Sequence, residues 1–75
     1  MQASSQQDFL DKLSKRLIDL RKENDLTQAK LAQETKLDRT ALANIENGRR
    51  RPTITTLYKI SVALNMKIED IFKGM

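Results

Sequence analysis

The sequence predicts an all-α protein, a compact bundle of about five helices within one domain over residues 1–75. Three observations support this fold class. Apolar residues recur at the three- and four-residue spacing of amphipathic helices. Residues that cap or stop helices lie at the borders of these apolar segments. Alternation of apolar and polar residues, which indicates a half-buried strand, is absent from the sequence.

The first helix is predicted over residues 6–23. Ser5 is followed three residues later by Asp8, the spacing of a capping box at a helix start. One apolar stripe of this helix is expected to pack on the core, and it consists of Phe9, Leu13, Leu17 and Leu20. Residues 1–5 precede the helix and are expected to be flexible.

Two short helices joined by a tight turn are predicted over residues 27–47. Thr27 is expected to cap the second helix, which spans residues 28–35. Asp38 is expected to cap the third helix. Gly48 should end it, since glycine readily takes the left-handed conformation that closes a helix. The linking turn is only about three residues long, so a sharp angle between the two helices is expected.

Two further helices are predicted after Pro52, which cannot continue a helix. Thr53 is expected to cap the fourth helix. The apolar stripe of this helix is predicted to be Ile54, Leu57, Ile60, Val62, Ala63 and Leu64. A short fifth helix should end at Gly74, and it draws its apolar residues from Met66, Ile68, Ile71 and Phe72.

The third helix has two faces of different character. On a 3.6-residue period, one side suits packing on a core and carries Asp38, Ala41, Leu42 and Ile45. The other side carries Arg39, Thr40, Ala43, Asn44 and Asn47. This second side lacks the Glu and Lys that usually solvate a helix, and its guanidinium, hydroxyl, methyl and amide groups can read base edges in a DNA major groove. A solvated surface rich in amides is the alternative interpretation.

The composition argues against an enzyme. The chain contains no cysteine and no histidine, so disulfides, thiolate nucleophiles and most acid–base and transition-metal chemistry are absent. We therefore expect neither catalysis nor a cofactor or metal. No apolar run approaches the ~20 residues of a membrane span, and the N-terminus lacks an export signal, so we expect a cytoplasmic protein without a membrane partner.

The positive charge of the chain is concentrated in one segment. The net charge is +4, and residues 27–56 carry six basic against three acidic residues. Arg49, Arg50 and Arg51 follow the third helix directly, where a basic loop would meet the phosphates that flank a groove. A basic patch suits a polyanion, although small soluble domains are often mildly basic without such a role.

Residues 17–72 resemble the DNA-binding domain of phage repressors and Cro proteins, the XRE-type helix-turn-helix family with a lambda-repressor-like fold. The matching segments are RLIDLRKENDLTQAKLA, LDRTALANIENGRRRP and TLYKISVALNMKIEDIF. They include LTQ before the second helix, an alanine four residues after Gln28, IENG near the end of the third helix, and ALN before the last helix. The ordered set is more specific than a single helix-turn-helix pattern.

The resemblance assigns roles to individual residues and makes the third helix the recognition helix of a motif at residues 27–47. The implied base-contacting residues are Arg39, Thr40, Ala43 and Asn44. The implied phosphate-contacting residues are Gln28, Asn47, Arg49, Arg50, Arg51 and Thr53. A structural salt bridge between Arg21 and Glu46 is also implied. Lys36 departs from the family pattern, which prefers glycine at this turn position.

LDRT at the start of the third helix, in a chain of this size, resembles the controller proteins of restriction-modification systems. That resemblance implies a homodimer on an inverted-repeat operator in a bacterium or phage, with double-stranded DNA, a second copy and RNA polymerase as partners. The expected dimer surface is the apolar C-terminal end, formed by Met66, Ile68, Ile71, Phe72 and Met75, unless these residues only close a small core. A small phage repressor and an antitoxin-type protein-binding helical module remain alternatives.

Overall fold

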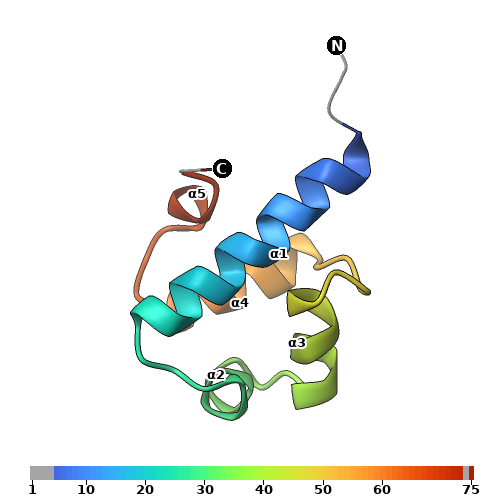
Figure 1. The fold of residues 1–75 in the computed structure, drawn as a ribbon. Coiled ribbons are helices and arrows are strands. Elements are labelled where there is room, and N and C mark those ends of the chain that lie inside the picture. The colour runs from blue at the N-terminus through green and yellow to red at the C-terminus, as the bar shows by residue number, and fades with distance from the viewer. Residues whose placement is uncertain (1–4, 74) are drawn as a thin grey trace.

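The computed structural model describes residues 5–73 and 75 and is all-helical over them, which confirms the predicted fold class. The helices are α1 (Gln6–Glu23), α2 (Gln28–Thr35), α3 (Arg39–Glu46), α4 (Ile54–Ala63) and α5 (Ile68–Ile71). In Figure 1, α1 runs across the front of the bundle and α4 crosses behind it. Helices α2 and α3 lie together at one end, and α5 lies on the other side of α1 from α3. The predicted flexibility of residues 1–4 lies outside the described residues. The fifth helix was predicted to end at Gly74, but it ends at Ile71, with Phe72 as its C-cap.

Local capping sets the starts of the helices. At α1 the Ser5 hydroxyl accepts a hydrogen bond from the Asp8 backbone N–H at 3.0 Å, and the Asp8 carboxylate accepts one from the Ser5 N–H at 3.4 Å. Thr27 and Thr53 cap α2 and α4 through their hydroxyls. Asp38 occupies the predicted cap position of α3 in an extended conformation, but its side chain accepts no capping hydrogen bond. Asp38 therefore lies at the predicted cap position, but the predicted capping by its side chain is wrong.

The turn between α2 and α3 takes a left-handed conformation at Lys36, with φ 60° and ψ 27°. This geometry brings the Leu37 backbone N–H to 3.0 Å from the Ala32 carbonyl and closes the end of α2. A side chain in this conformation costs roughly 1 kcal/mol relative to glycine. The turn thus keeps the geometry that glycine favours, and Lys36 carries the strain. Gly48 closes α3 with φ 81°, as predicted.

The core runs through the centre of the bundle and takes side chains from all five helices. It consists of Leu13, Leu17, Leu20, Leu31, Ala32, Leu42, Ile45, Leu57, Ile60, Leu64 and Ile71. Most of the predicted stripe of α1 belongs to it, but Phe9 is 46% exposed. The N-terminal end of α1 projects beyond the other helices, so Phe9 has little to pack against (Figure 1).

The predicted stripe of α4 needs a larger correction. Ile54 and Val62 were predicted to face the core, yet they are 67% and 58% exposed. The buried face of α4 follows the spacing of Leu57, Ile60 and Leu64, with the small Ser61 beside them. Ile54 and Val62 lie off this face.

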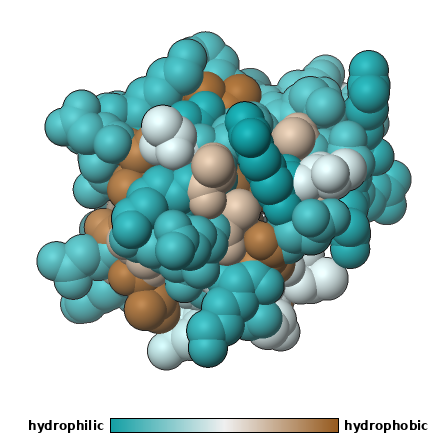
Figure 2. Space-filling view, turned by 90° about the horizontal axis from the view of Figure 1, so that it is seen from below, coloured by the Kyte–Doolittle hydropathy of each residue, from teal (hydrophilic) through white to brown (hydrophobic). Residues whose placement is uncertain are grey.

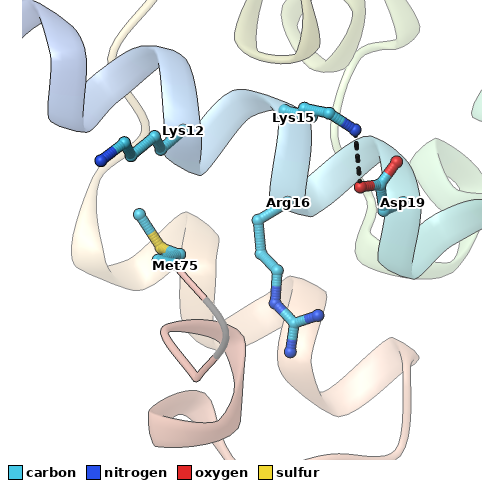
Figure 3. Close-up of a pocket in the computed structure, with 5 residues that line it drawn as sticks. All are labelled: Lys12, Lys15, Arg16, Asp19 and Met75. Atoms are coloured by element: carbon cyan, nitrogen blue, oxygen red, sulfur yellow. Dashed lines mark hydrogen bonds and ion pairs between the residues drawn. The ribbon is translucent and has the colours of Figure 1, made fainter.

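The short helix α5 is held by an arginine from α1. Arg16 Nε donates to the Ile71 carbonyl at 2.9 Å, and Arg16 Nη2 donates to the Asp70 carbonyl at 3.0 Å. These carbonyls belong to the end of a helix, where the backbone acceptors lack partners within the helix. Figure 3 shows Arg16 turned away from Lys15, whose ammonium pairs with Asp19. A hollow of about 310 Å³ is lined by Lys12, Lys15, Arg16, Asp19 and Met75.

Candidate nucleic-acid interface

One side of α3 is fixed in the bundle. Leu42 is 0% exposed and Ile45 is 2% exposed. The Ser14 hydroxyl of α1 donates to the Ile45 carbonyl at 2.9 Å in a buried position. Ala41 is half-buried, and Asp38, which was predicted on this side, is exposed at the start of the helix. Because this side is packed and hydrogen-bonded, the direction of the opposite side is set by the core.

The opposite side of α3 carries the residues that the resemblance assigns to bases. Arg39 and Thr40 are exposed, and Ala43 and Asn44 are half-buried. The four side chains therefore lie along one accessible face of a rigid helix. An α-helix fits into a DNA major groove about 12 Å wide, and these four residues include no carboxylate to repel the phosphates.

A polar network joins this face to α1 and α2. Arg21 Nε and Glu46 Oε2 form an ion pair at 2.8 Å, and Arg21 Nη2 donates to Glu46 Oε1 at 3.1 Å. Arg21 Nη1 donates to the Leu26 carbonyl at 2.8 Å. The Arg21 and Glu46 side chains are only 12% and 3% exposed. This paired, buried network ties the start of α2 and the end of α3 to the last turn of α1.

Gln28 at the start of α2 belongs to the same network. Its Nε2 donates to Glu46 Oε1 at 2.9 Å. A carboxylate only accepts hydrogen bonds, so the amide nitrogen of Gln28 must face Glu46 and the amide oxygen must face elsewhere. One of the two amide hydrogens of Gln28 is thus used within the protein. The sequence did not predict this contact, because Gln28 and Glu46 are distant along the chain.

Three of the predicted contact residues meet at a hollow of about 300 Å³, namely Gln28, Ala43 and Asn47. Ile18 and Lys22 of α1 also line this hollow. No role was predicted for Lys22 from the sequence. Its position next to Arg21, in the last turn of α1, could have indicated that it lies near the candidate face. Lys22 adds a cation at the edge of the candidate face.

The loop after α3 folds back on the end of that helix. The backbone N–H groups of Arg49 and Arg50 donate to the Asn44 carbonyl at 2.9 and 3.1 Å. Asn47 Oδ1 accepts a further hydrogen bond from the Arg49 N–H at 3.0 Å. This use of its oxygen leaves the amide nitrogen of Asn47 as the donor for an outside acceptor. The three arginine side chains at 49–51 are exposed. They follow directly after α3, whose accessible face with Arg39, Thr40, Ala43 and Asn44 we call the reading face.

Thr53 is exposed, and its hydroxyl is engaged at the start of α4. The hydroxyl accepts from the Thr56 N–H at 3.1 Å and also donates to the Thr56 hydroxyl at 3.0 Å. A phosphate contact at this position would therefore use the free backbone N–H groups of the first turn of α4 rather than the Thr53 side chain.

Fewer of the residues predicted to form a C-terminal dimer surface are exposed than the sequence suggested. Ile71 is 0% exposed within the chain's own core, so it is not available to a second copy. Met66 and Ile68 are half-buried and pack against the same core. Phe72 and Met75 are each 37% exposed. The fold of α5 therefore uses most of these apolar residues to close the core.

Charges at α5 interact with one another. The Lys73 ammonium hydrogen-bonds Asp70 and lowers the pKa of that carboxyl, and Asp70 in turn raises the pKa of Lys73. Within the described residues, no helix is long and apolar enough to cross a membrane. The same residues contain no cluster of side chains suited to a metal ion.

Comparison with known proteins assigns the family. A helix-turn-helix family model, HTH_3, matches residues 17–71. The chain is 38% identical over 69 residues to the control protein C.MunI from Mycoplasma sp, covering 91% of this chain and 93% of that protein. It is 37% identical over 59 residues to the immunity repressor protein of Bacillus phage phi105, covering 79% of this chain and 41% of that repressor.

Solved structures show the same relationship. The restriction-modification controller protein C.AhdI from Aeromonas hydrophila superposes with a TM-score of 0.82 at 31% identity, covering 85% of this chain and 97% of that one. The controller protein C.Esp1396I gives a TM-score of 0.81 at 33% identity, covering 93% and 90% of the two chains. The chain therefore belongs to the XRE-type helix-turn-helix family of DNA-binding transcriptional regulators, which are not enzymes, and it is similar to controller proteins and phage repressors.

Proposed function

We propose that the protein regulates transcription, as a restriction-modification controller, by binding an inverted-repeat operator as a homodimer with one α3 in each half-site. The observation that carries this proposal is the carboxylate-free, accessible face of α3, whose direction is set by the buried Leu42 and Ile45 on its other side. A recognition helix needs this combination, because only a rigid helix can hold several side chains in register with base pairs.

Each residue of the reading face has chemical groups that suit particular base edges. The Arg39 guanidinium can donate two hydrogen bonds to guanine O6 and N7, and the Asn44 amide can pair with adenine N6 and N7. Thr40 is placed to contact a base or a phosphate. Ala43 leaves room for close approach and can touch a thymine methyl group.

A second set of residues positions the protein without reading sequence. Arg49, Arg50 and Arg51 extend beside the reading face, where they would neutralise phosphates. The backbone N–H groups at the start of α2 and α4, near Gln28 and Thr53, are suited to further phosphates. Asn47 can add its amide nitrogen. Lys22 extends the cationic edge on the other side of the hollow.

Regulation follows from where a dimer would bind. Two recognition helices in successive major grooves on the same side of a duplex lie about 34–36 Å apart, so the operator should be an inverted repeat with half-sites about one helical turn apart. A dimer placed in or beside a promoter would meet RNA polymerase there. This activity belongs in the cytoplasm of a bacterium, where promoter DNA is accessible.

A gel shift with the DNA upstream of the protein's own gene tests the proposal. We expect one retarded species on this DNA at concentrations that leave an unrelated duplex of equal length unbound. Specific sites are typically bound about 10³–10⁷ times more tightly than non-specific DNA. Equal affinity for the two duplexes would contradict sequence-specific binding. If the preferred site occurs only at a phage immunity region, the protein is a phage repressor, the role named for its phi105 relative.

A further inference from the structure

We propose that Asn47 is a site of spontaneous deamidation, and that the reaction weakens DNA binding by placing a carboxylate where α3 meets the arginine loop, residues 49–51. The reaction itself involves only this chain and water, whereas its effect on DNA rests on the proposed function. Four asparagines occur in the sequence, and Asn47 is the one that precedes a glycine. It is exposed at the end of α3. The inference thus assigns a covalent modification to a residue of the candidate interface.

The reaction is an attack of the backbone on the side chain. The Gly48 nitrogen loses its proton and bonds to Cγ of Asn47, and the side-chain nitrogen takes up a proton and leaves as ammonia. The product is a five-membered succinimide ring. Water opens this ring at either carbonyl and leaves aspartate or isoaspartate at position 47, without an oxidant or a reductant. Glycine favours the ring closure because it has no Cβ to hinder the approach of its own nitrogen.

The other three asparagines lack this combination of features. Asn44 is half-buried within α3 and precedes Ile45, whose branched side chain crowds the backbone nitrogen. Asn24 and Asn65 are exposed, but each precedes a residue larger than glycine. The sequence and the exposure together therefore single out Asn47.

The folded backbone holds Asn47 away from the reactive geometry. Its ψ of 4° places the Gly48 nitrogen on the side of the Asn47 backbone nitrogen, and not toward the side chain. Rotation into the reactive position must break the hydrogen bond from the Gly48 N–H to the Ile45 carbonyl, which is long at 3.3 Å. Asn47 is the C-cap of α3, and helix ends open more readily than helix centres. The reaction therefore requires a local opening of the last turn of α3.

Contacts of the arginine loop oppose the same opening. The N–H groups of Arg49 and Arg50 donate to the Asn44 carbonyl at 2.9 and 3.1 Å, and the Arg49 N–H also donates to Asn47 Oδ1 at 3.0 Å. Phosphates bound by this loop would hold these contacts in place. A ligand that binds only the closed form stabilises that form by mass action. Bound DNA should therefore slow the deamidation, and the modification should fall mainly on the free protein.

The product can keep the fold. An aspartate carboxylate at position 47 can still accept the hydrogen bond from the Arg49 N–H, because the acceptor in that bond is an oxygen. Figure 2 views the molecule from the end where α2 and α3 lie, and hydrophilic side chains cover most of this surface. Position 47 is exposed, so the new charge remains in water. The change should therefore leave the helices in place.

The product loses a DNA contact and gains a repulsion. A carboxylate only accepts hydrogen bonds, so it cannot replace the amide nitrogen that Asn47 offers to a phosphate. It also adds a negative charge directly before the arginines at 49–51. Like charges that face each other across an interface weaken binding strongly. Free protein should therefore lose DNA affinity irreversibly as it ages, whereas bound protein should keep it.

Peptide mapping of aged protein tests the chemistry. Trypsin cuts after Arg39 and Arg49, so one peptide, residues 40–49, contains both Asn44 and Asn47. After long incubation at mildly alkaline pH, fragment spectra should show aspartate and isoaspartate at position 47, with Asn44 intact as the internal control. No conversion, or equal conversion of the two asparagines, would overturn the inference. Aspartate without isoaspartate would also overturn it, because direct hydrolysis gives that product alone.

The same incubation with DNA tests the protection. The duplex upstream of the protein's own gene, at a concentration that saturates the gel shift, should slow the conversion of Asn47 at least about threefold relative to an unrelated duplex of equal length. Equal rates with the two duplexes, where the gel shift shows that only the first is bound, would refute protection by DNA.

Two variants separate this inference from the proposed function. Asn47→Asp should keep the circular dichroism spectrum of the parent and bind the upstream duplex at least about tenfold more weakly. Asn47→Gln should keep its own initial affinity through the incubation while the parent loses affinity, because its longer side chain must close a larger ring. Binding by Asn47→Asp as tight as that of the parent would overturn the effect on DNA. Fresh parent protein that prefers neither duplex would instead refute the proposed function, and the peptide map would still decide whether Asn47 deamidates.

Discussion

Glu46 of α3 accepts a hydrogen bond from Gln28 of α2 at 2.9 Å while the Arg21 guanidinium holds both oxygens of the same carboxylate. One buried acid thus sets the position of α2 relative to α3. Since the two helices form the helix-turn-helix, their relative position determines whether base and phosphate contacts can be made together. Glu46 therefore acts within the protein, where it connects α3 to α1 and α2.

Glu46→Gln should destabilise the protein strongly. The substitution keeps the side-chain shape but leaves the Arg21 charge buried without its partner, which costs on the order of 3–5 kcal/mol. Urea denaturation followed by circular dichroism measures the free energy of unfolding. Asp19→Asn is the matched control, because the Lys15–Asp19 pair is exposed and worth only about 0.3–0.5 kcal/mol. Equal losses in the two variants would show that the buried network contributes little.

Arg39→Ala and Arg50→Ala should weaken DNA binding in different ways. Arg39→Ala should cost about 1–3 kcal/mol on the operator and relax the preference at one base pair. Arg50→Ala should weaken operator and unrelated DNA by a similar factor, because it removes a phosphate contact. Binding titrations against operators with each base pair changed in turn distinguish the two. The division into reading and positioning residues is wrong if both variants give the same profile.

The affinity for the operator should depend steeply on salt. If the dimer makes about 6–10 phosphate contacts, affinity should fall by roughly 10³- to 10⁵-fold between 50 and 200 mM salt, because counterions are released on binding. Fluorescence anisotropy at four salt concentrations gives the slope. Arg50→Ala should reduce that slope by about one. A nearly flat salt dependence would instead favour a protein partner over DNA.

Arg16→Met should loosen α5 without disturbing the DNA-binding face. Methionine replaces the apolar stem of Arg16 but cannot make the two hydrogen bonds of its charged guanidinium. Each of these bonds contributes no more than about 1.5–3 kcal/mol. Amide hydrogen exchange should be faster at Ile71 and its neighbours than in the control variant Lys12→Met. The amides of α3 should exchange at the same rate in the two variants. Faster exchange in α3 to the same extent would mean that α5 and α3 unfold together.

Lys36→Gly should stabilise the protein by roughly 1 kcal/mol, since glycine takes the left-handed conformation of this turn without strain. Thermal denaturation measures the change. Lys30→Gly is the control with the opposite expected sign, because Lys30 lies within α2, where glycine costs about 1 kcal/mol relative to a good helix former. Destabilisation by Lys36→Gly would show that the lysine side chain makes a favourable contribution that outweighs the strain.

The sequence by itself determined where helices begin and end, because those choices rest on interactions within a few residues. Ser5, Thr27 and Thr53 cap helices through hydrogen bonds to residues three positions away, and Gly48 ends α3 through its own backbone conformation. The two faces of α3 were also readable, since they follow from the helical period and from the side chains present.

Only the tertiary structure decided which side of α4 is buried and where Gln28 donates its hydrogen bond. Ile54 and Val62 are as apolar as Leu57, so a pattern read along α4 cannot tell which of them other helices cover. Ile71 was predicted to be available to a second copy, but it is 0% exposed in the core, where α5 contacts α1. Such assignments depend on contacts between residues distant in the chain, and these contacts are set by how the helices pack.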